Sequence, residues 1–184
     1  LPALLAYFLF GLGYVIYMTF LISWLKLNGE GVLLTSAVWS LMGIAVVVSP
    51  LLWRDVLSNA YAGRAIAWTS LALAIGAIVP IVGTPIGILA SAFIFGGSMF
   101  MVPTSVTNFA KRSVQPNLMG AAVALFTVVF SIGQILGPIG AGIVLDLTGN
   151  SNLVLFLTTG ILSLGVSAAL FQPSIIVGEN KVRP

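Results

Sequence analysis

The chain has 184 residues, 59% hydrophobic and only 6% charged, and its mean hydropathy of +1.16 excludes a water-soluble domain, because too few polar side chains are available to cover an apolar core. Its formal net charge of +3 comes from scattered Lys and Arg residues rather than from a clustered basic surface, so we expect no nucleic-acid partner. The chain contains no Cys and no His, which excludes disulfides, His-ligated zinc or haem and Ser-His catalysis, and we expect no metal site and no cofactor.

Six apolar segments follow one another along the chain, each near or above the ~20 residues that cross a bilayer as a helix. They cover residues 3–25, 33–52, 65–82, 85–110, 118–145 and 153–171. The sequence therefore predicts an all-α integral membrane protein with six transmembrane helices in one bundle, partnered by the lipid bilayer. A polar tail, too hydrophilic to enter the bilayer, is expected at residues 172–184.

Basic residues separate these segments unevenly and predict the orientation. Six of the seven lie in the second connection, the fourth connection and the tail: Arg54, Arg64, Lys111, Arg112, Lys181 and Arg183. The positive-inside rule then places both termini on the cytoplasmic side. The chain begins on an apolar segment without a methionine or a basic region before it, so we expect a piece of a longer protein rather than a signal peptide.

The first segment carries a stripe at helical spacing in which all members but Leu21 are aromatic, called here the aromatic stripe. Its members are Tyr7, Phe10, Tyr14, Tyr17, Leu21 and Trp24, three or four residues apart. Tyr14 and Tyr17 lie near the middle of the span, where a hydroxyl needs a polar partner. Two interpretations stay open: these tyrosines line a cavity, or they pack between helices with their hydroxyls bonded to the backbone. Trp24, like Trp53, is expected at the membrane interface.

The fourth segment contains residues that loosen a helix, namely the pair Gly96 and Gly97 and, further on, Pro103. Proline removes a backbone hydrogen bond and bends a helix. A bent helix with Thr104 and Asn108 towards its cytoplasmic end could form a gate or a binding element. The alternative is that Gly and Pro are simply more common in membrane helices.

The fifth segment combines a polar stripe, Thr127, Ser131 and Gln134, with small residues around a proline. These helix-packing or gating candidates are Gly133, Gly137, Pro138 and Gly142. Small residues at four-residue spacing allow a second helix to approach closely. Gln134 either donates hydrogen bonds across this seam or contacts a substrate, and both interpretations stay open.

The six spans contain no Asp, Glu, Lys or Arg. Because ionisable side chains within a membrane usually serve proton or ion transfer, we expect no buried proton carrier in this chain. An intramembrane serine hydrolase is excluded on the same ground, since Ser98 has no base to take its proton. We therefore expect no enzymatic activity and no catalytic residue.

At this point the sequence resembles the major facilitator superfamily (MFS), and specifically its C-terminal six-helix half. The fifth helix of such a repeat can carry a G-x3-G-P-x2-G-G pattern, which Gly133, Gly137, Pro138 and Gly142 match, with Ala141 in place of one glycine. The signature of the loop between the second and third helices survives only as a degenerate form at residues 50–64. More narrowly, residues 10–20, 95–100 and 130–138 resemble the YbfB/YjiJ-like branch.

The resemblance implies a secondary active transporter of the plasma (inner) membrane that works by alternating access, with this chain as the C-terminal half of a twelve-helix protein. Its implied partners are a small-molecule substrate and the N-terminal six-helix half. The first and fourth helices would line a cavity, and the second and fifth would meet the other half. The implied cavity residues are Tyr14, Tyr17, Thr104, Asn108 and Gln134.

Two alternatives accompany this interpretation: a six-helix carrier that works as a homodimer, and a membrane scaffold without transport. The substrate is unknown. Because the spans contain no ionic group, their share of a pocket suits neutral, aromatic or amphipathic solutes better than strongly charged ones.

Overall fold

The computed structural model describes residues 1–61 and 63–173, and this part of the chain is helical without a strand. The elements are α1 (Pro2–Leu27), α2 (Val32–Leu52), α3 (Arg54–Asn59), α4 (Arg64–Ile78), η1 (Val79–Val82), α5 (Pro85–Met99), α6 (Met101–Ser113), η2 (Pro116–Leu118), α7 (Met119–Thr148) and α8 (Ser151–Leu170). They form six runs long and apolar enough to span a membrane, which confirms the predicted fold class. Most of the predicted tail, residues 174–184, lies outside the described residues.

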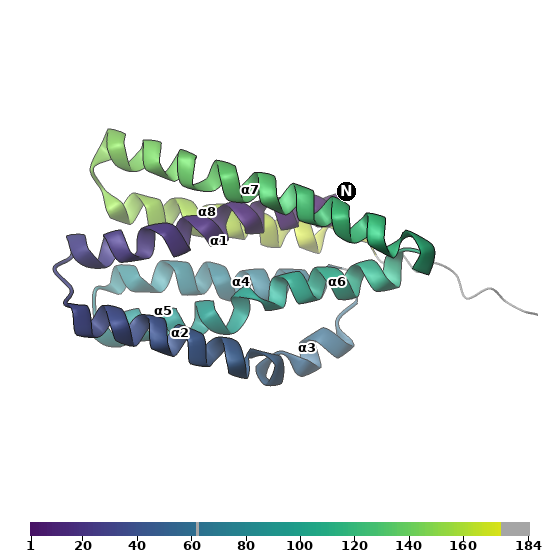
Figure 1. Ribbon diagram of the computed structural model, residues 1–184, viewed down its shortest axis with the longest axis horizontal. Coiled ribbons are helices and arrows are strands. Elements are labelled where there is room, and N and C mark those ends of the chain that lie inside the picture. The colour runs from purple at the N-terminus through teal and green to yellow at the C-terminus, as the bar shows by residue number, and fades with distance from the viewer. Residues whose placement is uncertain (62, 174–184) are drawn as a thin grey trace, which may run out of the picture.

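The helices pack as one elongated bundle (Figure 1). α1 lies against both α7 and α8, α4 lies against α8 and α5, and α2 packs mainly on α5. The first and last spans are therefore neighbours, and the amide of Ala3 donates a hydrogen bond of 3.0 Å to the side-chain oxygen of Gln172. This bond satisfies one of the backbone donors that every helix start leaves unpaired.

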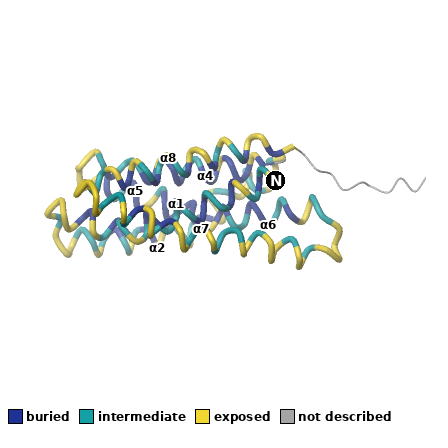
Figure 2. Tube along the Cα trace, turned by 90° about the horizontal axis from the view of Figure 1, so that it is seen from above, coloured by how far each residue is buried: buried dark blue, intermediate teal, exposed yellow. Residues whose placement is uncertain are grey.

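Buried residues run along the middle of the bundle, and exposed residues follow its edges (Figure 2). The aromatic stripe of α1 supplies a large share of this core, with Phe10, Tyr17 and Leu21 fully or almost fully buried. Trp24, expected at the membrane interface, lies three residues before the end of α1 and packs within the bundle. Its ring is buried, and its indole nitrogen donates to Asn152 of α8 at 2.7 Å, because a neighbouring helix offers the indole both cover and an acceptor.

The connections contain two regions that are more helical than the sequence predicts. Lys111 and Arg112, expected in the fourth connection, belong to the last turn of α6. Positive charge is favourable there because the carbonyl ends of the backbone make a helix C-terminus partly negative. The second connection contains α3, a short helix that begins at Arg54 directly after α2.

The fourth span is interrupted at Phe100, where α5 ends and α6 begins. Three residues later, Pro103 has no amide to donate to the carbonyl of Met99, and its ring crowds that carbonyl. At the interruption the carbonyl of Phe100 accepts two hydrogen bonds from Thr104, one from its amide at 3.3 Å and one from its hydroxyl at 2.8 Å. The helix break that Pro103 predicts is therefore present.

Replacing Pro103 by Ala should make α5 and α6 more continuous, because an amide at position 103 can donate to the carbonyl of Met99. Spin labels at Ile86 and at Lys111, near the two ends of the span, should then move apart by several ångströms in pulsed electron paramagnetic resonance. Pro116→Ala is the control, since Pro116 starts η2 outside this span. An unchanged distance distribution for Pro103→Ala would contradict a proline-imposed break.

Candidate functional site

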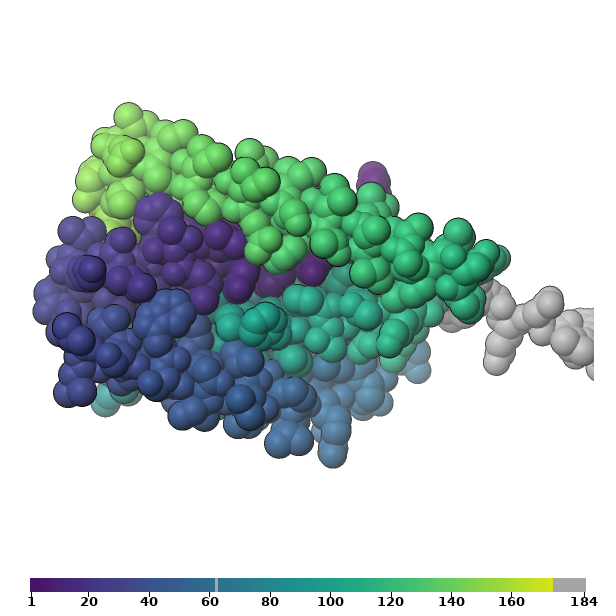
Figure 3. Space-filling view, viewed as in Figure 1, coloured from purple at the N-terminus to yellow at the C-terminus, as the bar shows by residue number. Residues whose placement is uncertain are grey.

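One broad face of the bundle has α7 and α2 along its two edges, with α1 and α6 between them (Figure 3). The four elements belong to the fifth, second, first and fourth spans. All five candidate cavity residues come from these elements: Tyr14 and Tyr17 from α1, Thr104 and Asn108 from α6, and Gln134 from α7.

An aromatic stack joins α1 to α7 in this region. Phe130 of α7 stacks on Tyr7 with ring centroids 5.0 Å apart, and on Phe10 at 5.4 Å. Phe10 in turn stacks on Tyr14 at 5.4 Å. The predicted stripe therefore continues on to the neighbouring helix, and the rings together form a wall that follows α1 along the bundle.

Tyr17 lies three residues beyond Tyr14 on α1 and is completely buried. Its ring stacks on Phe95 of α5 with centroids 3.8 Å apart, and its hydroxyl lies 2.5 Å from the hydroxyl of Ser91. Since Ser91 donates its own proton to the carbonyl of Gly76 at 2.6 Å, Tyr17 must be the donor of the pair. Of the two interpretations, helix packing describes Tyr17 in this bundle, because three helices meet at its hydroxyl.

Tyr14 and Gln134 differ from Tyr17 because both are only partly buried. Neither side chain makes a hydrogen bond with another residue of the described part of the chain. They lie at similar levels of the bundle: Gly133 and Gly137, on either side of Gln134, pack against Leu12, two residues before Tyr14. A phenol and an amide are thus available near the middle of the spans for a polar partner from outside this bundle.

Thr104 and Asn108 occupy different environments on α6. The hydroxyl proton of Thr104 is already used within its own helix. Asn108 lies towards the end of α6 and lines a pocket with Arg54 and Lys111. The next residue back, Thr107, shares a small pocket with Tyr7, which lies about two helical turns from Tyr14. The structure therefore does not group Asn108 with Tyr14 and Gln134.

The small residues of α7 bring it close to α1. A Cβ atom added at Gly133 would lie 2.5 Å from the carbonyl oxygen of Phe8, and one at Gly137 would lie 2.6 Å from that of Leu12. In this bundle the helix that lies close to these two glycines is α1. Gly142 has no such neighbour, and Pro138, next to Gly137, is only partly buried.

The glycine pair of α5 faces α2 instead. A Cβ at Gly96 would lie 2.6 Å from the carbonyl oxygen of Met42, whereas one at Gly97 would meet only ordinary contacts. The carbonyl of Gly97 accepts a hydrogen bond of 2.8 Å from the indole of Trp53. Gly96 therefore permits close packing, and Gly97 serves as an anchor for the end of α2.

Sequence reasoning missed Ser91 and the pocket at the basic end of α6. Ser91 was visible as a polar residue in an apolar span, but nothing in its spacing indicated that it would meet Tyr17. The pocket joins residues more than fifty positions apart, which a reading of single segments does not bring together.

A family model described as "Uncharacterised MFS-type transporter YbfB" matches residues 1–170, that is, every described span. A comparison with curated proteins finds no match.

Proposed function

Because the chain belongs to this YbfB-like family of MFS transporters, an integral multi-pass family, we propose that it is the C-terminal six-helix half of a twelve-helix secondary carrier working by alternating access. The other half would cover the face on which α1 and α6 lie between α7 and α2 (Figure 3). The substrate would bind between the halves. The protein would lie in the inner membrane. Both of its termini would face the cytoplasm, in keeping with the distribution of Lys and Arg.

The observation that carries this proposal is a pair of polar groups, the phenol of Tyr14 and the amide of Gln134, that form no side-chain hydrogen bond within residues 1–61 and 63–173. Leaving such groups in contact with lipid is costly, so they are best accounted for by a water-filled cavity or a bound solute. The aromatic wall next to Tyr14 would offer such a solute flat apolar surface. A neutral, aromatic or amphipathic small molecule therefore fits this half of the pocket best.

A proton-coupled cycle would need its titratable group in the other half. The only Asp, Glu, Lys and Arg side chains in the described spans lie near the ends of those spans, such as Lys26 and Asp146, and none lies at the level of Tyr14. Replacing the Asp and Glu residues of the other half one at a time should therefore locate any residue that couples transport to protons. If proton coupling survives every replacement, the coupling group does not lie in the other half as proposed.

The size of the native polypeptide tests the twelve-helix proposal. An antibody against the segment around α3 should detect a band at about twice the 19.2 kDa of this chain. A native product of the size of this chain alone would instead favour a homodimeric carrier or a scaffold. Chemical crosslinking in membranes would then separate those two, since only the homodimer gives a crosslinked pair.

Cysteine accessibility tests the cavity without knowledge of the substrate, and this chain has no native Cys to interfere. We expect Tyr14→Cys and Gln134→Cys to react with a charged, membrane-impermeant thiol reagent. Tyr17→Cys, buried in the bundle, should react slowly, and Leu164→Cys on the exposed surface of α8 should meet lipid and stay unlabelled. Equal rates at Tyr14 and Leu164 would contradict a water-filled cavity along α1.

A further inference from the structure

A basic pocket with a volume of about 400 Å³ lies between the α2–α3 corner and the end of α6. Three cationic side chains line it: Arg54 from α3, and Lys111 and Arg112 from α6. The side-chain amide of Asn108 adds a group that can donate hydrogen bonds, whereas the hydroxyl of Ser58 already donates to the carbonyl of Asp55 at 3.2 Å. In the described part of the chain, no acidic residue lines this pocket.

The interruption at Phe100 accounts for the position of this pocket. α2 packs closely along α5, but beyond the break α6 runs towards α7 and away from the end of α2 (Figure 1). The ends of α2 and α6 therefore diverge. Arg54 begins α3 just after α2, and Lys111 and Arg112 lie in the last turn of α6, so the space between is bordered by positive charge on two sides.

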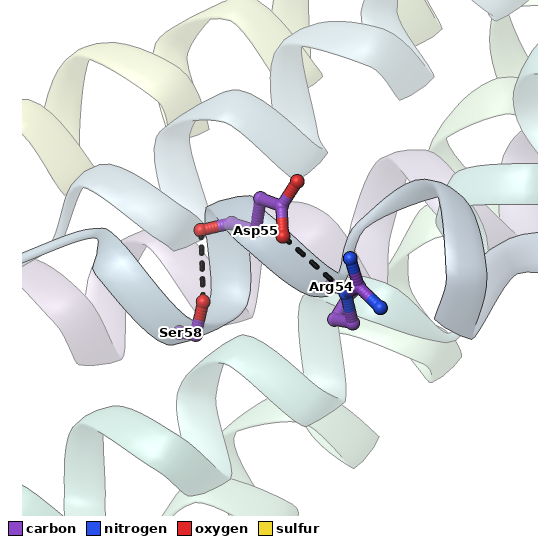
Figure 4. Close-up of polar contacts among 3 residues, drawn as sticks. All are labelled: Arg54, Asp55 and Ser58. Carbon is purple, nitrogen blue, oxygen red and sulfur yellow. Dashed lines mark hydrogen bonds and ion pairs between the residues drawn. The ribbon is translucent and has the colours of Figure 1, made fainter.

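The cations of the pocket keep donors available. Arg54 donates through Nε to the carboxylate of Asp55 at 3.3 Å (Figure 4). This pair is weak, because its two side chains are 77% and 81% exposed. A guanidinium has five N–H groups, so the terminal nitrogens of Arg54 keep theirs.

Arg112 is held in place from the other side. Its two terminal nitrogens donate to the carbonyl of Ala60 at 3.0 Å and to that of Ser58 at 3.2 Å. These bonds fix the guanidinium across the pocket and leave three N–H groups unused. A preorganised guanidinium loses less conformational entropy when it binds an anion.

We propose that this pocket binds a phosphate group, carried by the headgroup of an anionic phospholipid. Guanidinium groups pair with phosphate through two parallel hydrogen bonds, and Lys111 would add a compact charge. The lipid source is favoured by position, since the pocket lies at the end of a span, on the side predicted to be cytoplasmic. Pro50 and Leu57 of the lining, together with Leu51 next to Pro50, which is 76% exposed, provide apolar surface at the pocket for acyl chains. Basic pockets between membrane helices are suited to such headgroups.

Lipid titration of the whole transporter in detergent tests this proposal. Native mass spectrometry would measure the affinity for short-chain phosphatidylglycerol, with phosphatidylcholine as the zwitterionic comparison and inorganic phosphate as the free anion. Arg54→Gln and Lys111→Gln should each weaken phosphatidylglycerol binding about fivefold, and the double variant about 25-fold. Neither should change the thermal stability much, because both side chains are exposed.

Arg64→Gln is the matched control, because Arg64 is an exposed basic residue of the same connection but does not line the pocket. It should change phosphatidylglycerol binding less than twofold. If inorganic phosphate alone shows the dependence on Arg54 and Lys111, the phosphate chemistry is right and the lipid source is wrong. An equal loss in Arg64→Gln, or no loss in any variant, overturns the proposal. This test does not depend on transport, so its failure leaves the proposed function untouched.

Discussion

Tyr17→Ala should destabilise the bundle by about 3 kcal/mol or more, because it removes a buried aromatic ring and leaves a cavity that the surrounding helices cannot fill. The lost ring stacks on Phe95, and the lost hydroxyl is the donor to Ser91. Without a hydrophobic driving force between helices in lipid, such packing and hydrogen bonding hold the bundle together. Reversible unfolding in mixed detergent micelles would measure the loss.

Two control variants separate the parts of this effect. Tyr17→Phe keeps the stacked ring and removes only the hydrogen bond, so we expect a loss of about 1 kcal/mol. Tyr61→Ala removes the same side chain from a site that is 72% exposed, with an expected loss below about 0.5 kcal/mol. If Tyr17→Ala costs no more than Tyr61→Ala, Tyr17 does not join α1 to α5 as described.

Gly133→Ala should be the second most damaging of these substitutions. The added Cβ would lie 2.5 Å from the carbonyl oxygen of Phe8 and 2.9 Å from the amide nitrogen of Leu12. Both neighbours are backbone atoms, so no side chain can turn aside and the two helices must separate. Overpacking of this kind typically costs about 1–3 kcal/mol.

Gly140→Ala, seven residues further along the same helix, is the matched control for Gly133→Ala. A Cβ there meets no atom of the described residues within 4 Å, and Ala is a better helix former than Gly. This variant should keep or slightly raise the melting temperature, whereas Gly133→Ala should lower it and reduce the yield of folded protein. Equal melting temperatures would mean that α7 does not depend on close contact with α1.

The sequence predicts the spans well because the length of an apolar run reports directly on the thickness of the bilayer. All six spans begin and end within a few residues of their expected bounds. The structure also agrees with the prediction for two further features: the face of α1 that carries the aromatic stripe, and the helix break before Pro103. Both follow from local rules: helical periodicity in the first case and the missing amide of proline in the second.

Features that depend on which helix lies opposite could not be predicted. Glycine spacing in α7 indicates a close neighbour but cannot identify it as α1, and an isolated Ser91 cannot point to Tyr17. The same holds for Trp24, whose acceptor Asn152 comes from the far end of the chain. The roles of Tyr14, Gln134 and the other candidate cavity residues remain proposals, because a cavity between two halves is a property of both.

The position of α1 between α7 and α8 bears on the order of events during synthesis. The ribosome delivers α1 to the membrane first among these spans, yet its principal neighbours are the last two to emerge. The surfaces of α1 that carry Gly11 and Tyr7 therefore lack their helix partners until α7 and α8 are inserted. Until then they are shielded by lipid, by the insertion machinery or by a chaperone. Assembly of the bundle is thus a late event, and a ribosome that stalls before α7 would leave an inserted but unassembled chain exposed to membrane proteases.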